Sequence, residues 1–422
     1  MGGVARMTDA FVLGSYSTAF GKFTERSHKE LTREAYLGVL ADAGLANGDS
    51  IGMAWFGNCG MWTDGQGGIR GQVCLTPLVR EGLFPERVPV INVEGGCATA
   101  SMALHGAWKD VIAGQTDLSL AIGVEKTFSP DDPEKTARLF NGGIDQYDPA
   151  EWSAYYTAAG EVAGKPFAPG ANRTIFMDTY AMQAAWHMRA YGTTARQIAI
   201  ACAKNHVASV YKPKAQYRFP LTANDVLADR PVSWPLTRAM CAPIGDGAAS
   251  ALVCSRAFLD RQPAAIRARA VRIAASVLTG GKYRRLDEPG LSGLAASRAY
   301  AMAGLSAADI DLAEVHDATS FCELYQSEML GFCLPGEGGR LAESGATSLG
   351  GSIPLNLSGG LVSKGHPVGA TGLSMIDELM LQLRCEAGPR QVPGARIALA
   401  ENGGGVIGFD EAACSVIILH RD

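Results

Sequence analysis

The amino-acid sequence predicts an α/β fold built from two related halves. Strand-like apolar runs alternate with helix-like segments along most of the chain, as at Phe11–Tyr16 followed by His28–Ala43. The segment Arg33–Gly57 shares its pattern with Leu294–Asp317: an alanine-rich helix, an Ala-Gly-Leu stop, a short loop and an apolar strand. Self-similarity of this kind indicates a duplicated α/β unit.

Composition limits the class of protein. With 422 residues, 47% of them hydrophobic and 19% charged, the chain is long enough for two or three domains and is not of the disordered type. The net charge of -5 argues against a nucleic-acid partner. No apolar run is long enough for a membrane span, and the N-terminal stretch has no apolar signal core. Ten scattered cysteines without a CxxC pair predict free thiols, no metal site and a cytoplasmic protein.

The segments of the first half can be placed in order. Strands are expected at 51–57, 88–93, 118–124 and 250–254, with a helix at 72–81 that contains Pro77. We place the halves at residues 1–256 and 257–422, with a strand at 270–278 opening the second. Residues 127–240 form an aromatic-rich insertion with helices at 175–191 and 194–209. The insertion is either a lid over a binding site or a subdomain that only packs.

A single cysteine marks the turning point of the first half. The strand before Gly95-Gly96 is followed directly by Cys97 and a helix-forming stretch, which predicts a strand–turn–helix elbow. A thiol there lies beside the N-terminal end of a helix, and we expect this to lower its pKa and favour the nucleophilic thiolate. The alternative is a buried structural cysteine, which this stretch alone does not exclude.

The repeat brings second-half loops toward the elbow. The segments 90–97 and 353–360 match, and each has an asparagine three residues before Gly-Gly, so Asn356 and Gly360 become candidate binding residues. Two of the seven histidines, His316 and His366, fall in loops at strand ends or before a helix. The glycine run 403–405 follows another strand, and its backbone N–H groups suit an oxyanion hole, with Gly404 and Gly405 as candidates.

These residues resemble the thiolase superfamily over nearly the whole chain. GGCATASMALH, HDATSF, NLSGGLVSKGHPVGATG and ENGGG are similar to its four active-site loops, and the His-Asp pair resembles the sterol-carrier-protein type. The resemblance implies a thiolase-like fold: two βαβαβαββ halves in five αβαβα layers, with an inserted loop domain. It implies Cys97 as the acyl-accepting nucleophile, His366 as its activator and His316 in an oxyanion hole.

The chain also departs from this pattern. Thiolases have a second cysteine as acid and base, and neither of the positions where relatives place it holds one here, since Ala318 and Glu401 stand there. Glu401 is the first candidate to replace it, if burial raises its pKa. Glu323 and Tyr325 are weaker alternatives, and Cys322 is assigned to the core.

The resemblance implies an acyltransferase that cleaves or forms a 3-oxoacyl-CoA through an acyl-Cys97 intermediate, with coenzyme A as substrate and no bound cofactor. The aromatic residues 147, 152, 155, 156 and 167 favour a bulky or aromatic acyl group such as benzoylsuccinyl-CoA. The alternatives are a retro-aldol lyase on a 3-hydroxyacyl-CoA and a non-catalytic CoA- or lipid-binding subunit. Implied partners are a second copy, as homodimer or tetramer, and a small OB-fold protein with a zinc ribbon.

Overall fold

A nine-stranded mixed sheet organises the computed structural model, which describes residues 9–170 and 173–421. From one edge to the other the strands are β3 (Val90–Val93), β2 (Met53–Gly57), β4 (Leu118–Lys126), β7 (Asp246–Ser255), β1 (Ala10–Ser17), β8 (Val271–Gly280), β11 (Ala413–His420), β10 (Ile397–Gly404) and β9 (Leu312–Glu314). The two halves of the sheet meet where β1 pairs with β8. That contact joins only Phe11 to Arg272 and Val12 to Val271.

Both halves repeat one pairing scheme. In the first, β2 pairs in parallel with β3 and β4, and β7 is antiparallel to both β4 and β1. In the second, β10 is parallel to β9 and antiparallel to β11, which is antiparallel to β8. The counterpart of β3 shrinks to a bridge between Ala313 and Leu355. Pro354 lacks an N–H group and Asn356 has a φ of 54°, so a regular strand ends there. The predicted duplication is confirmed.

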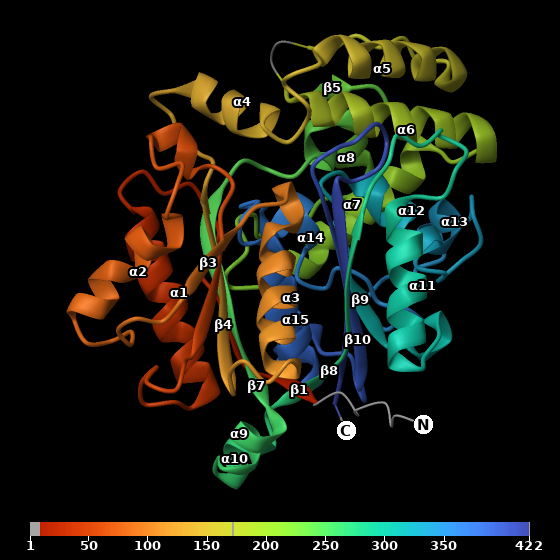
Figure 1. Cartoon of the computed structure of the whole chain (residues 1–422). Helices are drawn as coiled ribbons and strands as arrows, with labels where there is room; N and C mark the ends of the chain where they lie inside the picture. Colours follow the sequence, from red (N-terminus) through yellow and green to blue (C-terminus); the bar gives the residue numbers. More distant parts are fainter. Residues whose placement is uncertain (1–8, 171–172, 422) are drawn as a thin grey trace, which may run out of the picture.

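Helices cover both outer faces of the folded sheet and fill the space between its halves (Figure 1). They are α1 (His28–Ala43) and α2 (Arg70–Arg80) outside the first half, α3 (Thr99–Ile112) and α15 (Thr371–Leu383) in the centre, and α11 (Leu291–Ala303) outside the second half. Strand residues are apolar on both faces: Ala121 packs toward α3 and α15, whereas Leu120 and Ile122 pack toward α1 and α2. The five layers expected from the sequence are therefore present.

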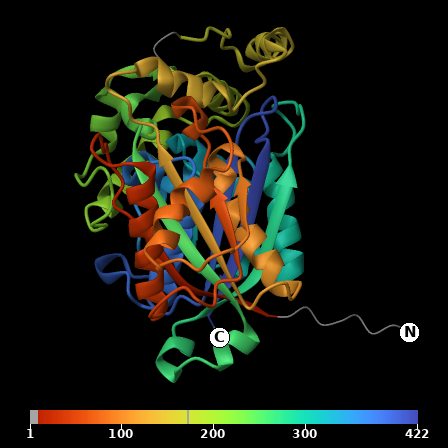
Figure 2. The same cartoon turned by 60° about the vertical axis from the view of Figure 1, so that its left-hand side comes forward.

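The chain between β4 and β7 forms a helical cap. Its elements are α4 (Pro133–Asn141), α5 (Pro149–Ala163), α6 (Ile175–Tyr191), α7 (Ala195–Ser209), α8 (Ala223–Ala228) and a small hairpin of β5 (Pro231–Ser233) and β6 (Leu236–Thr237). Figures 1 and 2 show α4, α5 and α6 at one end of the molecule, beyond the strands. Thr194 caps α7 by accepting a hydrogen bond from the Gln197 N–H, so this helix begins one residue after the predicted start at 194.

The remaining helices are short or join the second half to the cap. They are α9 (Arg256–Asp260), α10 (Ala264–Arg267), α12 (Ser320–Met329), α13 (Gly338–Glu343) and α14 (Gly360–Lys364). In the described ranges, 9–170 and 173–421, no helix has the length and apolar character to cross a bilayer. Residues 1–8, part of the stretch for which the sequence predicts no signal segment, lie outside the described residues.

Candidate active site

Cys97 lies at a tight elbow that glycines make possible. Strand β3 ends at Val93, and Cys97 sits in a 3₁₀ turn (Gly96–Ala98) that runs directly into α3. Gly96 has a φ of 57°, and a Cβ atom on it would lie 2.4 Å from the Gly405 nitrogen. A Cβ atom on Gly404 would lie 2.2 Å from the Ala98 nitrogen. The end of β10 therefore lies against the elbow, and the structure places Gly404 and Gly405 beside the thiol.

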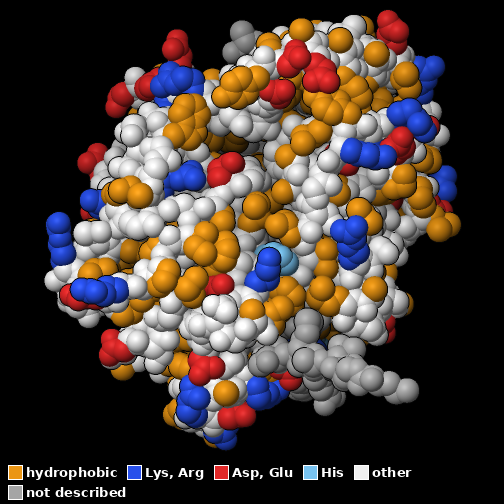
Figure 3. Space-filling view, viewed as in Figure 1, with side chains coloured by type: hydrophobic (Ala, Val, Ile, Leu, Met, Phe, Trp, Pro, Cys, Tyr) orange, Lys and Arg blue, Asp and Glu red, His pale blue; other side chains and the backbone are white. Residues whose placement is uncertain are grey.

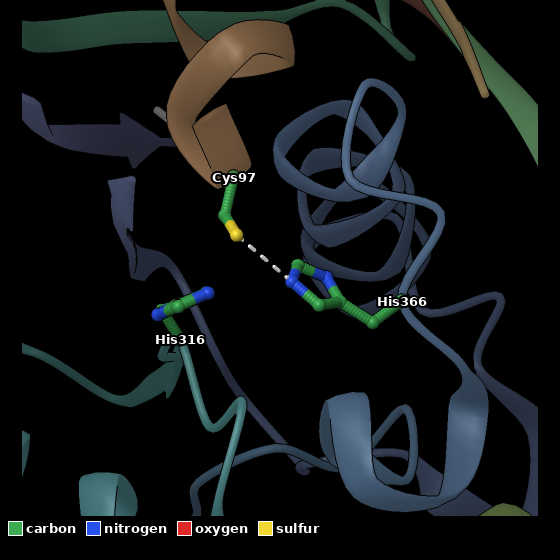
Figure 4. A group of neighbouring side chains, drawn as sticks. All are labelled: Cys97, His316 and His366. Carbon is green, nitrogen blue, oxygen red and sulfur yellow. Dashed lines mark hydrogen bonds between the residues drawn. The ribbon is translucent and has the colours of Figure 1, made fainter. Parts of the chain in front are cut away.

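His366 approaches the thiol from the loop between α14 and α15. Its Nε2 atom lies 3.1 Å from Cys97 Sγ, and its Nδ1 atom lies 2.7 Å from Thr371 Oγ1 (Figure 4). The Thr371 hydroxyl donates its own proton to the Pro367 carbonyl at 3.1 Å. Thr371 therefore accepts from an Nδ1–H group, and this assigns a lone pair to Nε2. That nitrogen can accept the proton of the Cys97 thiol.

His316 is the third member of the group. It follows β9, is 2% exposed, and its ring centroid lies 5.3 Å from that of His366. Figure 4 shows one ring nitrogen of His316 facing the space between Cys97 and His366. Its Nε2 atom has no hydrogen-bond partner among the described residues. Since a buried polar atom without a partner costs about 1–3 kcal/mol, this nitrogen is poised for an external ligand atom.

The expected low pKa of Cys97 is wrong. Burial raises the pKa of the thiol to about 12, Glu94 and Glu125 add to the rise, and only the backbone N–H of Cys97 opposes it. Leu139, Phe140 and Val368 form the apolar surroundings. Desolvation therefore raises the pKa of this thiol by more than the N-terminal end of α3 lowers it.

Both imidazoles are neutral for the same reason. Burial lowers the pKa of His316 to about 4, and burial, His316 and Lys364 together hold the pKa of His366 well below its usual range. The resting site is thus an uncharged thiol hydrogen-bonded to a neutral imidazole. The thiolate has to form as the proton passes to His366.

A buried polar network holds the loop of His316. Asp317 accepts hydrogen bonds from the Leu361 N–H at 2.6 Å and from the Asn205 amide at 2.9 Å. Asn356 accepts from the Val315 N–H and donates to Glu323, so both ends of its amide are used inside the protein. A Cβ atom on Gly360 would lie 2.2 Å from Asp317. The structure thus places Asn356 and Gly360 behind the His316 loop.

Glu401, near the end of β10, contacts the backbone of the His316 loop. One carboxyl oxygen accepts from the His316 backbone N–H at 3.0 Å, and the other lies 3.5 Å from Cys414 Sγ. Burial, followed by the nearby Glu411, raises its pKa to about 8. Glu401 therefore carries a proton at neutral pH, as its candidate role requires.

The weaker acid–base candidates have other surroundings. Glu323 pairs with Lys204 at 2.9 Å. The Tyr325 hydroxyl is buried without a hydrogen-bond partner among the described residues. Cys322 is a buried core thiol that lies 3.3 Å from the Thr319 hydroxyl.

A cavity of about 440 Å³ opens above Cys97. Its wall includes Cys59, Trp62, Arg70, Glu94, Leu139, Phe140, Phe176, Val368 and Gly405. The aromatic residues named from the sequence lie elsewhere: Trp152, Tyr155, Tyr156 and Phe167 pack together in the cap, and Tyr147 is fully exposed. The insertion instead contributes Phe140 and Phe176 to the cavity.

A second cavity, of about 790 Å³, is lined by residues 206–244 of the segment between β4 and β7, together with Lys22 and Val362. Three basic residues and three ring-bearing residues share its wall: Lys22, Arg230, Arg238, His206, Tyr217 and Phe219. Its segment 241–244 reaches the His316 loop, because the Ala242 N–H donates to the Ala318 carbonyl at 2.9 Å. One wall of the cavity is therefore in direct contact with the loop that carries His316.

Sequence reasoning did not find three of these residues. Thr371 stands five positions after His366 at the start of a helix, and that spacing could have identified it. Cys59 and Arg70 reach the cavity only through the packing of the segment after β2, which leaves no local signal. Arg70 donates to the Asn58 carbonyl, and no carboxylate pairs with it in the part of the chain that the structure describes.

Comparisons with known proteins agree with this geometry. The model of the thiolase N-terminal domain matches residues 10–147, and that of the thiolase C-terminal domain matches residues 292–420. An acetyl-CoA acetyltransferase of Methanothermobacter thermautotrophicus is 35% identical over 95% of this chain and 98% of its own. The benzoylsuccinyl-CoA thiolase subunit BbsB of Thauera aromatica is 29% identical over 94% of each chain.

Among solved structures, the Ltp2-ChsH2(DUF35) aldolase superposes with a TM-score of 0.75 over 98% of this chain and 97% of its own, at 24% identity. That likeness concerns the fold. The matches of both family models and the similarity to the acetyltransferase extend over the elbow and both histidine loops. The chain therefore belongs to the thiolase family of acyl-CoA acyltransferases.

Proposed function

We propose that this enzyme cleaves or forms 3-oxoacyl-CoA thioesters through an acyl-Cys97 intermediate. The observation that carries the proposal is the 3.1 Å contact between Cys97 Sγ and a neutral His366 whose Nε2 lone pair faces it. A thiol with an adjacent base, itself oriented by a third group, is the arrangement that nucleophilic catalysis uses.

In the cleavage direction, the thiol proton moves to His366 Nε2 as the sulfur attacks the 3-keto carbon. The carbon–carbon bond then breaks and leaves an acyl group on Cys97 and the enolate of a shorter acyl-CoA. Glu401 protonates the enolate, and its carboxylate then takes the proton of the coenzyme A thiol as this thiol attacks the acyl-Cys97. The Cys97 sulfur leaves as the new thioester forms and regains its proton from His366, so both groups return to their starting protonation states.

Two groups of donors suit the two developing oxyanions. His316 and His366 face the region where the enolate oxygen would lie, and His316 Nε2 has no internal partner. The backbone N–H groups of Cys97 and of Gly404 or Gly405 lie together at the elbow. Loss of one such donor costs about 100- to 1,000-fold in rate.

Proton transfer at the substrate α-carbon needs a further group, and we propose Glu401. Its pKa of about 8 suits both donation and acceptance near neutral pH. Its contact with the His316 backbone keeps it in the same loop cluster as the reacting atoms.

The larger cavity suits coenzyme A. Rings at His206, Tyr217 and Phe219 offer stacking surfaces for adenine, and Lys22 and Arg230 offer charge for phosphates. Arg238 lines the same cavity but pairs with Asp229 at 3.0 Å. The Ala242–Ala318 contact directs the other end of the cavity toward His316, as a pantetheine arm would require.

The cavity above Cys97 suits the acyl group. Trp62, Phe140 and Phe176 favour a bulky or aromatic acyl chain. The guanidinium of Arg70 bonds the Asn58 carbonyl and no carboxylate among the described residues, which favours an acyl chain that carries a carboxylate. Benzoylsuccinyl-CoA, the substrate in the name of the Thauera relative, has both features.

We further propose a cytoplasmic homodimer or tetramer, with a possible small OB-fold partner that carries a zinc ribbon. Strand β3 is an edge strand with half-buried residues, and hydrophobic side chains lie across the middle of the face in Figure 3, where β3 and α3 lie in Figure 1. The name of BbsB calls it a subunit, and the name of the Ltp2-ChsH2(DUF35) aldolase joins two proteins; both names support the proposal of a partner subunit.

The aromatic-rich insertion, residues 127–240, would act as a lid on the first half, which ends at residue 256.

Mass spectrometry of the protein after incubation with acetyl-CoA, acetoacetyl-CoA and aromatic 3-oxoacyl-CoAs tests the proposal. An acyl increment is expected on the Cys97 peptide, absent in Cys97→Ser. Cys59→Ser removes the other thiol of the same cavity and should keep the increment. If no thioester acylates Cys97 while Cys97→Ser still cleaves a 3-hydroxyacyl-CoA, the retro-aldol alternative holds. Binding without any turnover would favour a non-catalytic subunit.

A further inference from the structure

The three side chains at the elbow also have the composition of a metal site. The Sγ atom of Cys97 and one ring nitrogen each of His316 and His366 all lie within 4.8 Å of one another. In the described residues this is the one cluster of three or more such ligands so arranged. Figure 4 shows the three side chains converging from three separate loops.

Two features beyond proximity indicate a ligand. His316 is 2% exposed, and its buried Nε2 atom has no hydrogen-bond partner among the described residues. The Nδ1 atom of His366 is held by Thr371, and this points the Nε2 lone pair at the shared space. Metal-bound histidines are oriented in the same way, by a hydrogen bond at the other ring nitrogen.

We propose that Cys97, His316 and His366 bind a thiophilic divalent cation, with Zn²⁺ as the best fit, and that the bound ion masks the nucleophile. One thiolate and two imidazoles leave the fourth tetrahedral position open to water. Typical Zn–S and Zn–N distances of about 2.3 and 2.0–2.1 Å set tetrahedral ligand atoms about 3.3–3.6 Å apart. The 3.1 Å contact between Cys97 and His366 therefore has to open slightly, and the widest separation, at most 4.8 Å, has to close through rotation of side chains. Mg²⁺ is excluded by its preference for oxygen ligands.

Binding exchanges a proton for the metal. The Cys97 S–H bond breaks, the proton leaves to solvent, and the sulfur donates its electron pair to Zn²⁺, with no change of oxidation state. The same sulfur cannot then attack a thioester. Zn²⁺ and acyl-CoA therefore compete for one enzyme form. This masking rests on the proposed role of Cys97 as nucleophile, whereas the metal site itself rests on the geometry of the three ligands.

The test uses chelator-treated full-length protein and the metals alone. Zn²⁺ titrated against a chromophoric chelator should reveal one tight site per chain, and Co²⁺ should give a thiolate-to-metal charge-transfer band with tetrahedral d–d bands. Zn²⁺ should also slow alkylation of the Cys97 peptide by iodoacetamide, and Mg²⁺ should not. Absence of both the tight site and the thiolate band would overturn the proposal.

Variants assign the ligands. Cys97→Ser and His316→Asn should each weaken Zn²⁺ binding by more than about 100-fold, since changes to groups that merely orient a ligand already cost 10- to 100-fold. Cys385→Ser removes an exposed thiol, and His105→Asn removes a histidine outside the site, so both should leave the dissociation constant unchanged. Circular dichroism checks that each variant is folded. Equal Zn²⁺ affinity in a folded Cys97→Ser would place the ion elsewhere and refute the site.

Discussion

The hydroxyl of Thr371 accepts a hydrogen bond from His366 Nδ1 at 2.7 Å and donates to the Pro367 carbonyl at 3.1 Å. Only one tautomer of His366 satisfies its contacts with Thr371 and Cys97: the proton is on Nδ1, and the lone pair is on Nε2 next to the thiol. The opposite tautomer would put an N–H group in front of Cys97 and could not accept its proton. A residue without direct contact to the sulfur thus decides whether the base can work.

Replacement of Thr371 by Val should therefore lower kcat by about 10- to 100-fold with a smaller effect on KM. The variant loses the acceptor at Nδ1, and the buried N–H costs about 1–3 kcal/mol of stability. Steady-state kinetics and thermal unfolding measure the two effects. Thr371→Ser keeps the hydroxyl and should recover most of kcat. A Thr371→Ser variant as slow as Thr371→Val, or a loss of stability in Thr371→Val without a change in kcat, would contradict the relay between Thr371 and His366.

Gly404→Ala should inactivate the enzyme while a control glycine tolerates the same change. The new Cβ atom would lie 2.2 Å from both the Ala98 nitrogen and the Gly95 oxygen, and 2.7 Å from the Cys97 nitrogen, so β10 has to move off the elbow. We expect at least about a 100-fold loss of rate, as for a lost oxyanion donor. Gly280→Ala meets no atom within 4 Å and should keep full activity. Initial rates measure the activity of both variants, and circular dichroism checks that both are folded. A folded Gly404→Ala with full activity would contradict the prediction.

The fold was predictable because the sequence repeats its own pattern. Helices α1 and α6 begin and end at the expected residues, and the Cys97 elbow follows from one strand, two glycines and a helix-forming run. Strand β11 and the bridge at Leu355 were not foreseen. The bridge replaces a strand because Pro354 and Asn356 interrupt it, which a match of residue types does not reveal.

The candidate site was predictable in its members and not in its electrostatics. Cys97, His316 and His366 come together as the loop pattern indicates, but the thiol pKa rises where a helix end suggests a fall. Desolvation depends on Leu139, Phe140 and Val368, which reach the sulfur from distant segments. Which side chains line the cavity also depends on packing between distant segments. For this reason the sequence does not identify Arg70 as a cavity residue, and it does not reveal that the cap aromatics pack against one another instead of lining the cavity.

The carboxyl of Glu401 should make stability fall as pH rises. Its pKa is about 8 in the folded chain against a usual 4.5, so between these values the folded state holds a proton that the unfolded state has lost. Stability from this group is complete below about pH 4.5 and is lost as pH rises through 8. Denaturant unfolding at pH 5, 7 and 9 should show a smaller decline for Glu401→Gln than for wild type. Some decline should remain, since burial also raises the pKa of Glu125, to about 7.

The same variant tests the proposed proton transfer. If Glu401 serves the α-carbon, Glu401→Gln should lose about 100- to 10,000-fold in kcat for condensation or cleavage, together with the ionisation near pH 8 in the pH–rate profile. Acylation of Cys97 by a simple thioester needs no α-carbon proton and should survive. Unchanged kcat and an unchanged profile would assign Glu401 only to holding the His316 loop.

Arg70 should select acyl groups that carry a carboxylate. Its guanidinium lines the cavity above Cys97 and bonds only the Asn58 carbonyl among the described residues, so several N–H donors stay available to a substrate. A charge-assisted hydrogen bond is worth about 1.5–3 kcal/mol, which corresponds to about a 10- to 100-fold loss of kcat/KM in Arg70→Ala with a carboxylated 3-oxoacyl-CoA. With an uncharged aromatic 3-oxoacyl-CoA the same variant should keep its kcat/KM within about 3-fold, because no ionic contact is lost. Arg70→Lys keeps the charge without the planar guanidinium fork. Its kcat/KM for the carboxylated substrate should therefore fall between those of wild type and Arg70→Ala. An equal loss with both substrates would mean that Arg70 supports only the segment after β2, through its bond to Asn58.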